Sequence, residues 1–103
     1  MRFEIKDEFK ENTYNLMRRA GYVCLAENRE TGEINYIRSL APNGYPRFHI
    51  YLKKENKTLV FNLHLDQKRP IYKGTPAHSA DYDGEVLEKE KQRIKQFIMR
   101  GIV

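Results

Sequence analysis

The sequence predicts an α+β domain, a two-layer sandwich in which two helices cover one face of a four-stranded, mainly antiparallel sheet. Apolar residues recur with helical spacing near both ends of the chain, whereas two segments in the middle alternate strictly between apolar and polar residues. Clusters of glycine, proline and asparagine separate these segments. Both helices have an apolar face to cover and the sheet offers one such surface, so we expect them on the same face.

The expected elements follow one another as a helix, four strands and a helix. They span residues 7–20, 22–27, 34–40, 47–53, 59–66 and 85–100. Asp7 is the expected N-cap of the first helix, and Gly21 is its expected end. A turn at residues 28–32 joins the first two strands into a hairpin, and a short link around residues 55–57 joins the last two. Residues 67–84 form a long connection, and connections of that length often carry function.

The strands at residues 47–53 and 59–66 show the clearest alternation, so each buries one face and leaves the other open. The apolar residues expected to face the helices are Phe48, Ile50, Leu52, Phe61, Leu63 and Leu65. The polar residues expected on the open face are Arg47, His49, Tyr51, Asn62, His64 and Asp66.

The register of these two strands decides which polar side chains meet. A two-residue loop pairs His49 with Asn62, whereas a four-residue loop pairs His49 with His64 and Arg47 with Asp66. In both registers His49, His64 and Asp66 lie on one face, where directly opposite side chains have Cβ atoms about 4.5–5.5 Å apart. The sequence therefore predicts a cluster of these three side chains.

Length and composition fit one domain that spans residues 1–103. No segment has the roughly 18–20 apolar residues that cross a bilayer, so no membrane partner is expected. The first residues lack the apolar run of a signal peptide. Cys24 is the only cysteine, which excludes an internal disulfide, and its apolar surroundings predict a buried, unreactive thiol. These features favour a cytoplasmic protein and leave the oligomeric state open.

The net charge of +5 is concentrated in the middle of the chain. Residues 38–80 hold eight basic and two acidic residues, whereas the rest of the chain holds eleven and twelve. Such a concentration is typical of proteins that bind a polyanion. A small nucleic-acid-binding module, for RNA or single strands, is therefore the leading functional hypothesis. Lysines on exposed strands also prevent edge-to-edge aggregation, so a solvated sheet is the alternative interpretation.

The chain has seven tyrosines, and Tyr45, Tyr51 and Tyr72 lie within the basic segment 38–80. Aromatic rings beside arginine and lysine are typical of single-strand binding, in which bases stack and phosphates are neutralised. Tyrosines also border small cores with their hydroxyl groups in water, which is the structural alternative. The residues expected to bind nucleic acid are Arg47, Tyr51, Lys53, Lys54, Lys68, Arg69, Tyr72 and Lys73.

A second hypothesis is a small metal-dependent or histidine-based hydrolase or nuclease. His49, His64, Asp66 and His78 are the candidate catalytic residues, because imidazole groups transfer protons near neutral pH. His64, Asp66 and His78 are also candidate ligands for a divalent metal such as zinc. The alternative is a simple cross-strand ion pair between Arg47 and Asp66, since the His-x-Asp spacing is common in unrelated proteins.

A third hypothesis is a protein–protein interaction or oligomerising domain that covers the open face with another chain. Val60 lies on that face, and the edge strands of the sheet are exposed. The sequence has no P-loop, no dinucleotide fingerprint and no Gly-x-Ser-x-Gly elbow. Sequence motifs therefore leave open whether the protein is an enzyme.

Overall fold

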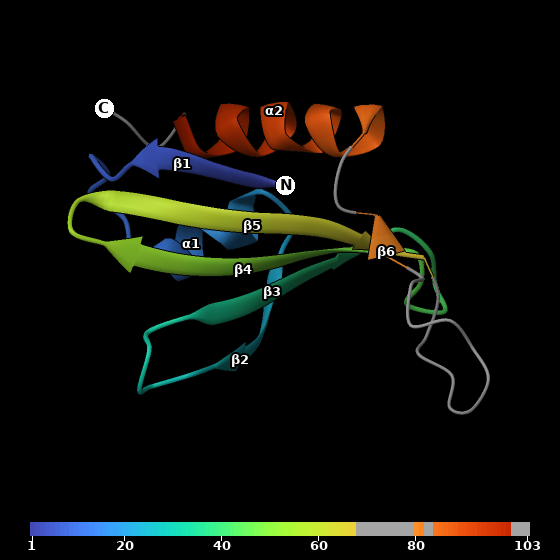
Figure 1. Ribbon diagram of the computed structural model, residues 1–103, viewed down its shortest axis with the longest axis horizontal. Coiled ribbons are helices and arrows are strands. Elements are labelled where there is room, and N and C mark those ends of the chain that lie inside the picture. The colour runs from blue at the N-terminus through green and yellow to red at the C-terminus, as the bar shows by residue number, and fades with distance from the viewer. Residues whose placement is uncertain (68–79, 82–83, 100–103) are drawn as a thin grey trace.

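The computed structural model describes residues 1–67, 80–81 and 84–99, which form a twisted antiparallel sheet and two helices (Figure 1). In chain order the elements are β1 (Arg2–Lys6), α1 (Thr13–Arg19), β2 (Val23–Glu27), β3 (Ile34–Ser39), β4 (Arg47–Glu55), β5 (Thr58–Asp66), β6 (Ala80–Asp81) and α2 (Glu85–Met99). The strand order is β1-β5-β4-β3-β2, and the two-residue β6 pairs with the end of β5. The predicted α+β class is confirmed.

The prediction of a four-stranded sheet is wrong, because residues 2–6 form an additional full strand, β1, beside β5. Phe3 and Ile5 point into the core and alternate with exposed neighbours. The ring of Phe3 stacks on that of Phe61, its partner in the register, with ring centroids 4.7 Å apart. This packing holds the N-terminal segment against the edge of β5.

Helix α1 is shorter than predicted and begins at Thr13. Asn12 is its N-cap, because the Asn12 Oδ1 atom accepts a hydrogen bond of 2.9 Å from the backbone N–H of Asn15. The predicted cap, Asp7, instead follows β1. The Asp7 carboxylate forms an ion pair of 2.9 Å with Lys54, so it ties this connection to the β4–β5 hairpin.

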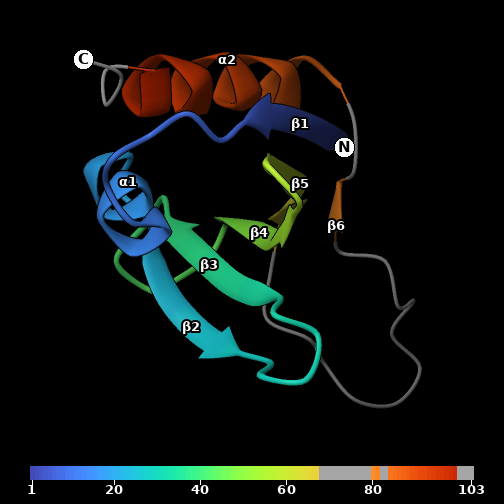
Figure 2. The same cartoon turned by 90° about the vertical axis from the view of Figure 1, so that its left-hand side faces the viewer.

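The core lies between the helices and one face of the sheet. All six apolar residues predicted to face the helices are buried there, together with Leu16 and Met17 of α1 and Leu87, Ile94 and Ile98 of α2. Both helices therefore share one core, but they cover different parts of the curved sheet. Helix α2 runs along β1 and β5, whereas α1 lies beside β2 (Figure 2).

A buried carboxylate fastens α2 to the rest of the core. Glu90 is 4% exposed and accepts hydrogen bonds from the Tyr22 hydroxyl at 2.6 Å and from Arg93 at 2.7 Å and 2.9 Å. Arg93 also donates to the backbone carbonyl of Ala20 at the end of α1. Burial, and then the neighbouring Glu90 carboxylate, raise the pKa of Tyr22, so its hydroxyl stays protonated and donates.

The β4–β5 hairpin adopts the register that pairs His49 with His64 and Arg47 with Asp66. The four-residue loop expected for this register is not formed, because the strands continue to Glu55 and Thr58 and leave a two-residue turn. Asn56 in this turn has φ of 58°, a left-handed conformation that asparagine tolerates better than most residues.

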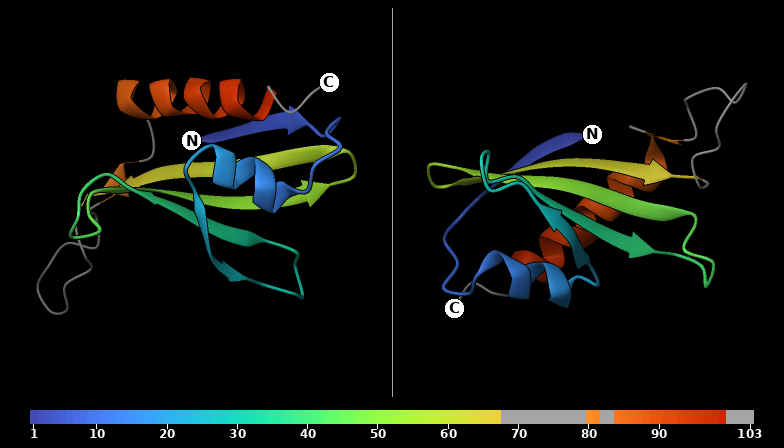
Figure 3. Two further views of the ribbon diagram at one scale, coloured as in Figure 1. Left: turned by 180° about the vertical axis from the view of Figure 1, so that it is seen from behind. Right: turned by 90° about the horizontal axis from the view of Figure 1, so that it is seen from below.

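Both described helices lie on one side of β4 and β5, so neither covers the opposite face of these strands (Figure 3). Of the two described helices, neither combines the length and the apolar content needed to span a membrane.

Candidate functional site

Three polar side chains converge on the face of the sheet that the described helices leave uncovered. We call His49, His64 and Asp66 the His-His-Asp cluster. The register sets His49 of β4 directly opposite His64 of β5, and Asp66 lies two residues further on the same face of β5. Each residue offers one potential metal-ligand atom, and these atoms lie within 4.8 Å of one another. The predicted convergence of these three residues is therefore observed.

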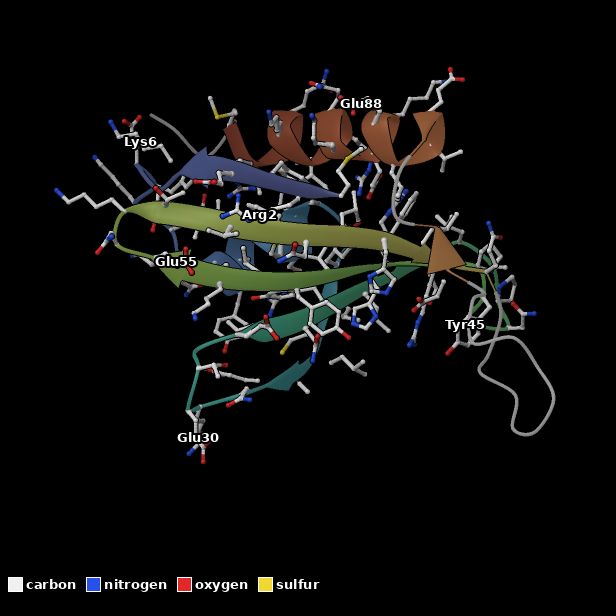
Figure 4. The ribbon with its side chains drawn as sticks, viewed as in Figure 1. Arg2, Lys6, Glu30, Tyr45, Glu55 and Glu88 are labelled. Carbon is white, nitrogen blue, oxygen red and sulfur yellow. The ribbon has the colours of Figure 1, made fainter. Side chains whose placement is uncertain are left out.

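The cluster lies near one end of the sheet. Tyr45, which precedes β4, marks this end in Figure 4, whereas Glu55 marks the opposite end of β4. Asp66 pairs across the ladders with Arg47 of β4 and with Ala80 of β6. Asp66 is therefore the last residue of β5, and at this position β5 has a neighbouring strand on each side.

Asp66 is the shared acceptor of the cluster. Its Oδ1 atom lies 2.9 Å from His64 Nε2, and its Oδ2 atom lies 3.3 Å from His49 Nδ1 and 3.2 Å from Arg47 Nε. The Arg47 guanidinium also lies over the Tyr45 ring, 4.7 Å from its centroid. Three donors from two strands therefore hold one carboxylate in a fixed orientation.

Aromatic packing fixes the two imidazole rings. The Tyr51 ring stacks on His49 with centroids 4.6 Å apart, and its centroid lies 5.8 Å from that of His64. The two histidine rings lie 4.7 Å apart. Tyr51 was predicted to bind nucleic acid, and in the structure part of its ring surface packs against His49.

Burial sets the protonation of both histidines. His49 is only 8% exposed, and burial lowers its pKa, with the neighbouring His64 acting in the same direction. Burial also lowers the pKa of His64, against the opposing effect of Asp66. Both rings are therefore neutral at neutral pH, and each then has one nitrogen with a lone pair.

One atom of the cluster is not satisfied by the contacts above. His49 Nε2 is buried and has no hydrogen-bond partner within the part of the chain that the structure describes. Buried polar atoms without a partner are uncommon in native proteins, and a bound ion is one of their explanations.

Of the residues predicted to bind nucleic acid, Arg47, Tyr51 and Lys53 lie on the face of the cluster. Lys54 does not, because adjacent residues in a strand point to opposite faces; it lies on the helix side and pairs with Asp7. Five predicted site residues lie outside the described part of the chain: Lys68, Arg69, Tyr72, Lys73 and His78.

Strand β1 adds two charged residues that were not predicted on this face. Arg2 pairs with Asn62 and Glu4 pairs with Val60, and the two charged side chains form an exposed ion pair of 2.8 Å. The alternation of Phe3 and Ile5 was the sequence signal for this strand. Val60, expected to be available to a protein partner, is only 6% exposed, so it offers little surface for one.

The single cysteine is exposed, which contradicts the prediction of a buried thiol. Cys24 lies on β2, the strand at the end of the sheet order, and all five residues of β2 are exposed. The apolar stretch around Cys24 therefore reflects an exposed edge strand, with Val23 60% and Leu25 53% exposed.

The chain was compared with protein-family models, with curated proteins and with solved structures, and none of the three comparisons finds a match.

Proposed function

We propose that the protein is a small hydrolase that cleaves phosphodiester bonds in RNA or single-stranded nucleic acid, with the His-His-Asp cluster as its reaction centre. The observation that supports this proposal is the convergence of His49, His64 and Asp66 within 4.8 Å on a face that no described helix covers. Imidazole and carboxylate groups held together in this way are the groups that enzymes use for proton transfer and for metal binding.

The geometry supplies the parts that such a reaction needs. Hydrolysis consumes one water: its oxygen forms the new bond to phosphorus, the ester oxygen leaves, and a proton is transferred to that leaving oxygen. The cluster holds lone-pair nitrogens and an oriented carboxylate to manage these protons. Arg47, bonded to Asp66, would place positive charge beside a phosphate group bound at the cluster.

Lys53 suits a more distant phosphate. It lies four residues from His49 on the same strand face, which is about 13 Å along the strand. No ion pair links it to another described residue. A polymeric substrate that extends along β4 would therefore meet the reaction centre and this lysine together.

The test is cleavage of short labelled single strands of RNA and DNA by the full chain. We expect Asp66→Asn and His64→Ala each to lower the rate at least about 100-fold, the contribution typical of one acid–base or orienting group. Asn62→Ala is the matched control, because Asn62 lies exposed on the same face of β5 and is expected to keep the wild-type rate. A wild-type chain that cleaves neither polymer, with or without added divalent metal, would contradict the proposal.

A second candidate function is binding of RNA or single strands without cleavage. The observation that favours it is the shared face of Arg47, Tyr51 and Lys53. Binding should weaken steeply with salt, and Lys53→Gln should reduce the slope of log K against log salt by about 1. Lys54→Gln is the control on the other face and should leave the slope unchanged. Equal slopes for all three proteins would count against binding through this face.

A further inference from the structure

We infer that the His-His-Asp cluster is a site for one divalent metal ion of the zinc class, with His49, His64 and Asp66 as its protein ligands. The inference deepens the proposed function and rests on it for the role of the ion, whereas binding of the ion can be measured without any activity. The sequence predicted His64, Asp66 and His78 as ligands; the structure brings His49 to the first two, and His78 lies outside the described residues.

The distances fit a small cation. Zinc binds nitrogen and oxygen at about 2.0–2.2 Å, so two ligand atoms on a tetrahedral ion lie about 3.3 Å apart. His64 Nε2 lies 2.9 Å from Asp66 Oδ1, and His49 Nδ1 lies 3.3 Å from Asp66 Oδ2. One ligand atom from each residue falls within 4.8 Å of the others. Small side-chain adjustments would therefore bring all three to ligand distance.

The unsatisfied Nε2 atom of His49 is not the atom that would bind the ion. A cluster held only by hydrogen bonds to Asp66 leaves the 8%-exposed His49 with a buried Nε2 that lacks a partner among the described residues. Because Nδ1 is the atom directed at Asp66, an ion shared with Asp66 would bind Nδ1 and leave the proton on Nε2, so Nε2 lacks a described partner with or without the ion.

The surroundings resemble the outer shell that supports metal ligands. Arg47 Nε donates to Asp66 Oδ2, which leaves Oδ1 directed toward His64. Tyr51 stacks on the His49 ring and fixes its plane. Such contacts orient the ligands of metal sites, and their loss typically weakens metal binding by about 10–100-fold.

The chemistry of the three ligands selects the class of ion. Two imidazoles and one carboxylate suit zinc and the neighbouring transition metals, whereas magnesium and calcium prefer sets of oxygen ligands. Three protein ligands leave a fourth position for water, which is the arrangement of catalytic rather than structural zinc. A water bound there would be more acidic than free water and would supply the attacking oxygen; its proton would pass to solvent, and solvent would protonate the leaving oxygen, because both imidazoles would be ligands.

The experiment is a titration of the untagged, metal-stripped chain with zinc and with cobalt(II), in which bound metal is counted after dialysis and cobalt is followed by its visible absorption. We expect one ion per chain. Asp66→Asn, which keeps the side-chain shape, and His64→Ala should each weaken binding at least about 100-fold, and Arg47→Gln should weaken it about 10-fold. Asn62→Ala should bind as the wild type does, and circular dichroism checks that each variant is folded.

A wild-type chain that binds neither ion, or that binds one ion equally well after Asp66→Asn and His64→Ala, would overturn the inference. Cleavage by the metal-stripped chain in the presence of a chelator would also overturn it, while the proposed hydrolase would stand. One bound ion with no cleavage of any nucleic acid would do the reverse: it would support the metal site and contradict the proposed function.

Discussion

Three side chains from β4 and β5 contact the carboxylate of Asp66. Arg47, His49 and His64 all approach its carboxylate, at 2.9–3.3 Å. A carboxylate held from several sides keeps one orientation, and a ligand or an orienting group in an enzyme requires such a fixed position. The register sets His49 of β4 opposite His64 of β5 on this face, so both rings reach Asp66.

Exposure of the single cysteine gives a prediction at the residue scale. The Cys24 thiol should react with a thiol reagent in the native protein at a rate within about tenfold of that in denaturant, because Cys24 lies exposed on the edge strand β2. The matched control is Cys24→Ser, which should give no signal. Protection by several orders of magnitude in the native state would mean that β2 is covered.

The strict alternation of β4 and β5 predicted the members of the cluster, because a period of two assigns each side chain to a face. The same rule directs Lys54 to the face opposite that of Lys53, which it follows directly, and Lys54 pairs there with Asp7. The unsatisfied His49 nitrogen could not be predicted, because it depends on how tightly the neighbouring rings pack.

At the scale of elements, the predicted strands agree with the structure within two residues at each end, and the two N-terminal elements do not. Strand β1 contains only two inward apolar residues, and its partner is β5, more than fifty residues away in the chain. Local periodicity carries no information about such a distant pairing. The predicted start of α1 is too early because Asp7 and Asn12 are both residue types that cap helices. Asp7 pairs with Lys54 instead, and Asn12 caps the helix.

Phe3→Ala tests the role of β1. The ring is 7% exposed and stacks on Phe61, so its removal should lower the free energy of unfolding by about 3 kcal/mol. Glu4→Ala, on the exposed side of the same strand, should change the free energy by less than about 0.5 kcal/mol. Urea unfolding followed by circular dichroism measures both, and equal values for the two variants would mean that β1 does not pack as described.

Glu90→Gln tests the attachment of α2. Removal of the charge leaves Arg93 and Tyr22 without their anionic acceptor, and we expect a loss of about 2 kcal/mol, below the usual cost for a fully buried pair because the Arg93 side chain is 26% exposed. Glu88→Gln, on the exposed side of the same helix, should cost less than about 0.5 kcal/mol. A loss of under about 0.5 kcal/mol for both variants in the same urea experiment would contradict this role.

At the scale of the whole molecule, the fold divides the described basic residues of the middle segment between two faces. Arg38 is directed to the helix side and pairs with Glu90, and Lys54 pairs with Asp7. Among the described residues of this segment, Arg47 and Lys53 lie on the uncovered face, and Arg47 is paired with Asp66.

The central claim, that His49 and His64 act together with Asp66 on one metal ion, is tested most directly by nitrogen-15 NMR of the histidine rings during a zinc titration. One equivalent of zinc should shift a ring nitrogen of both His49 and His64 into the range of metal-bound imidazole, and the Asp66→Asn variant should require far more zinc for the same shift. Ring signals of His49 and His64 that stay unchanged in the wild-type chain would contradict the claim.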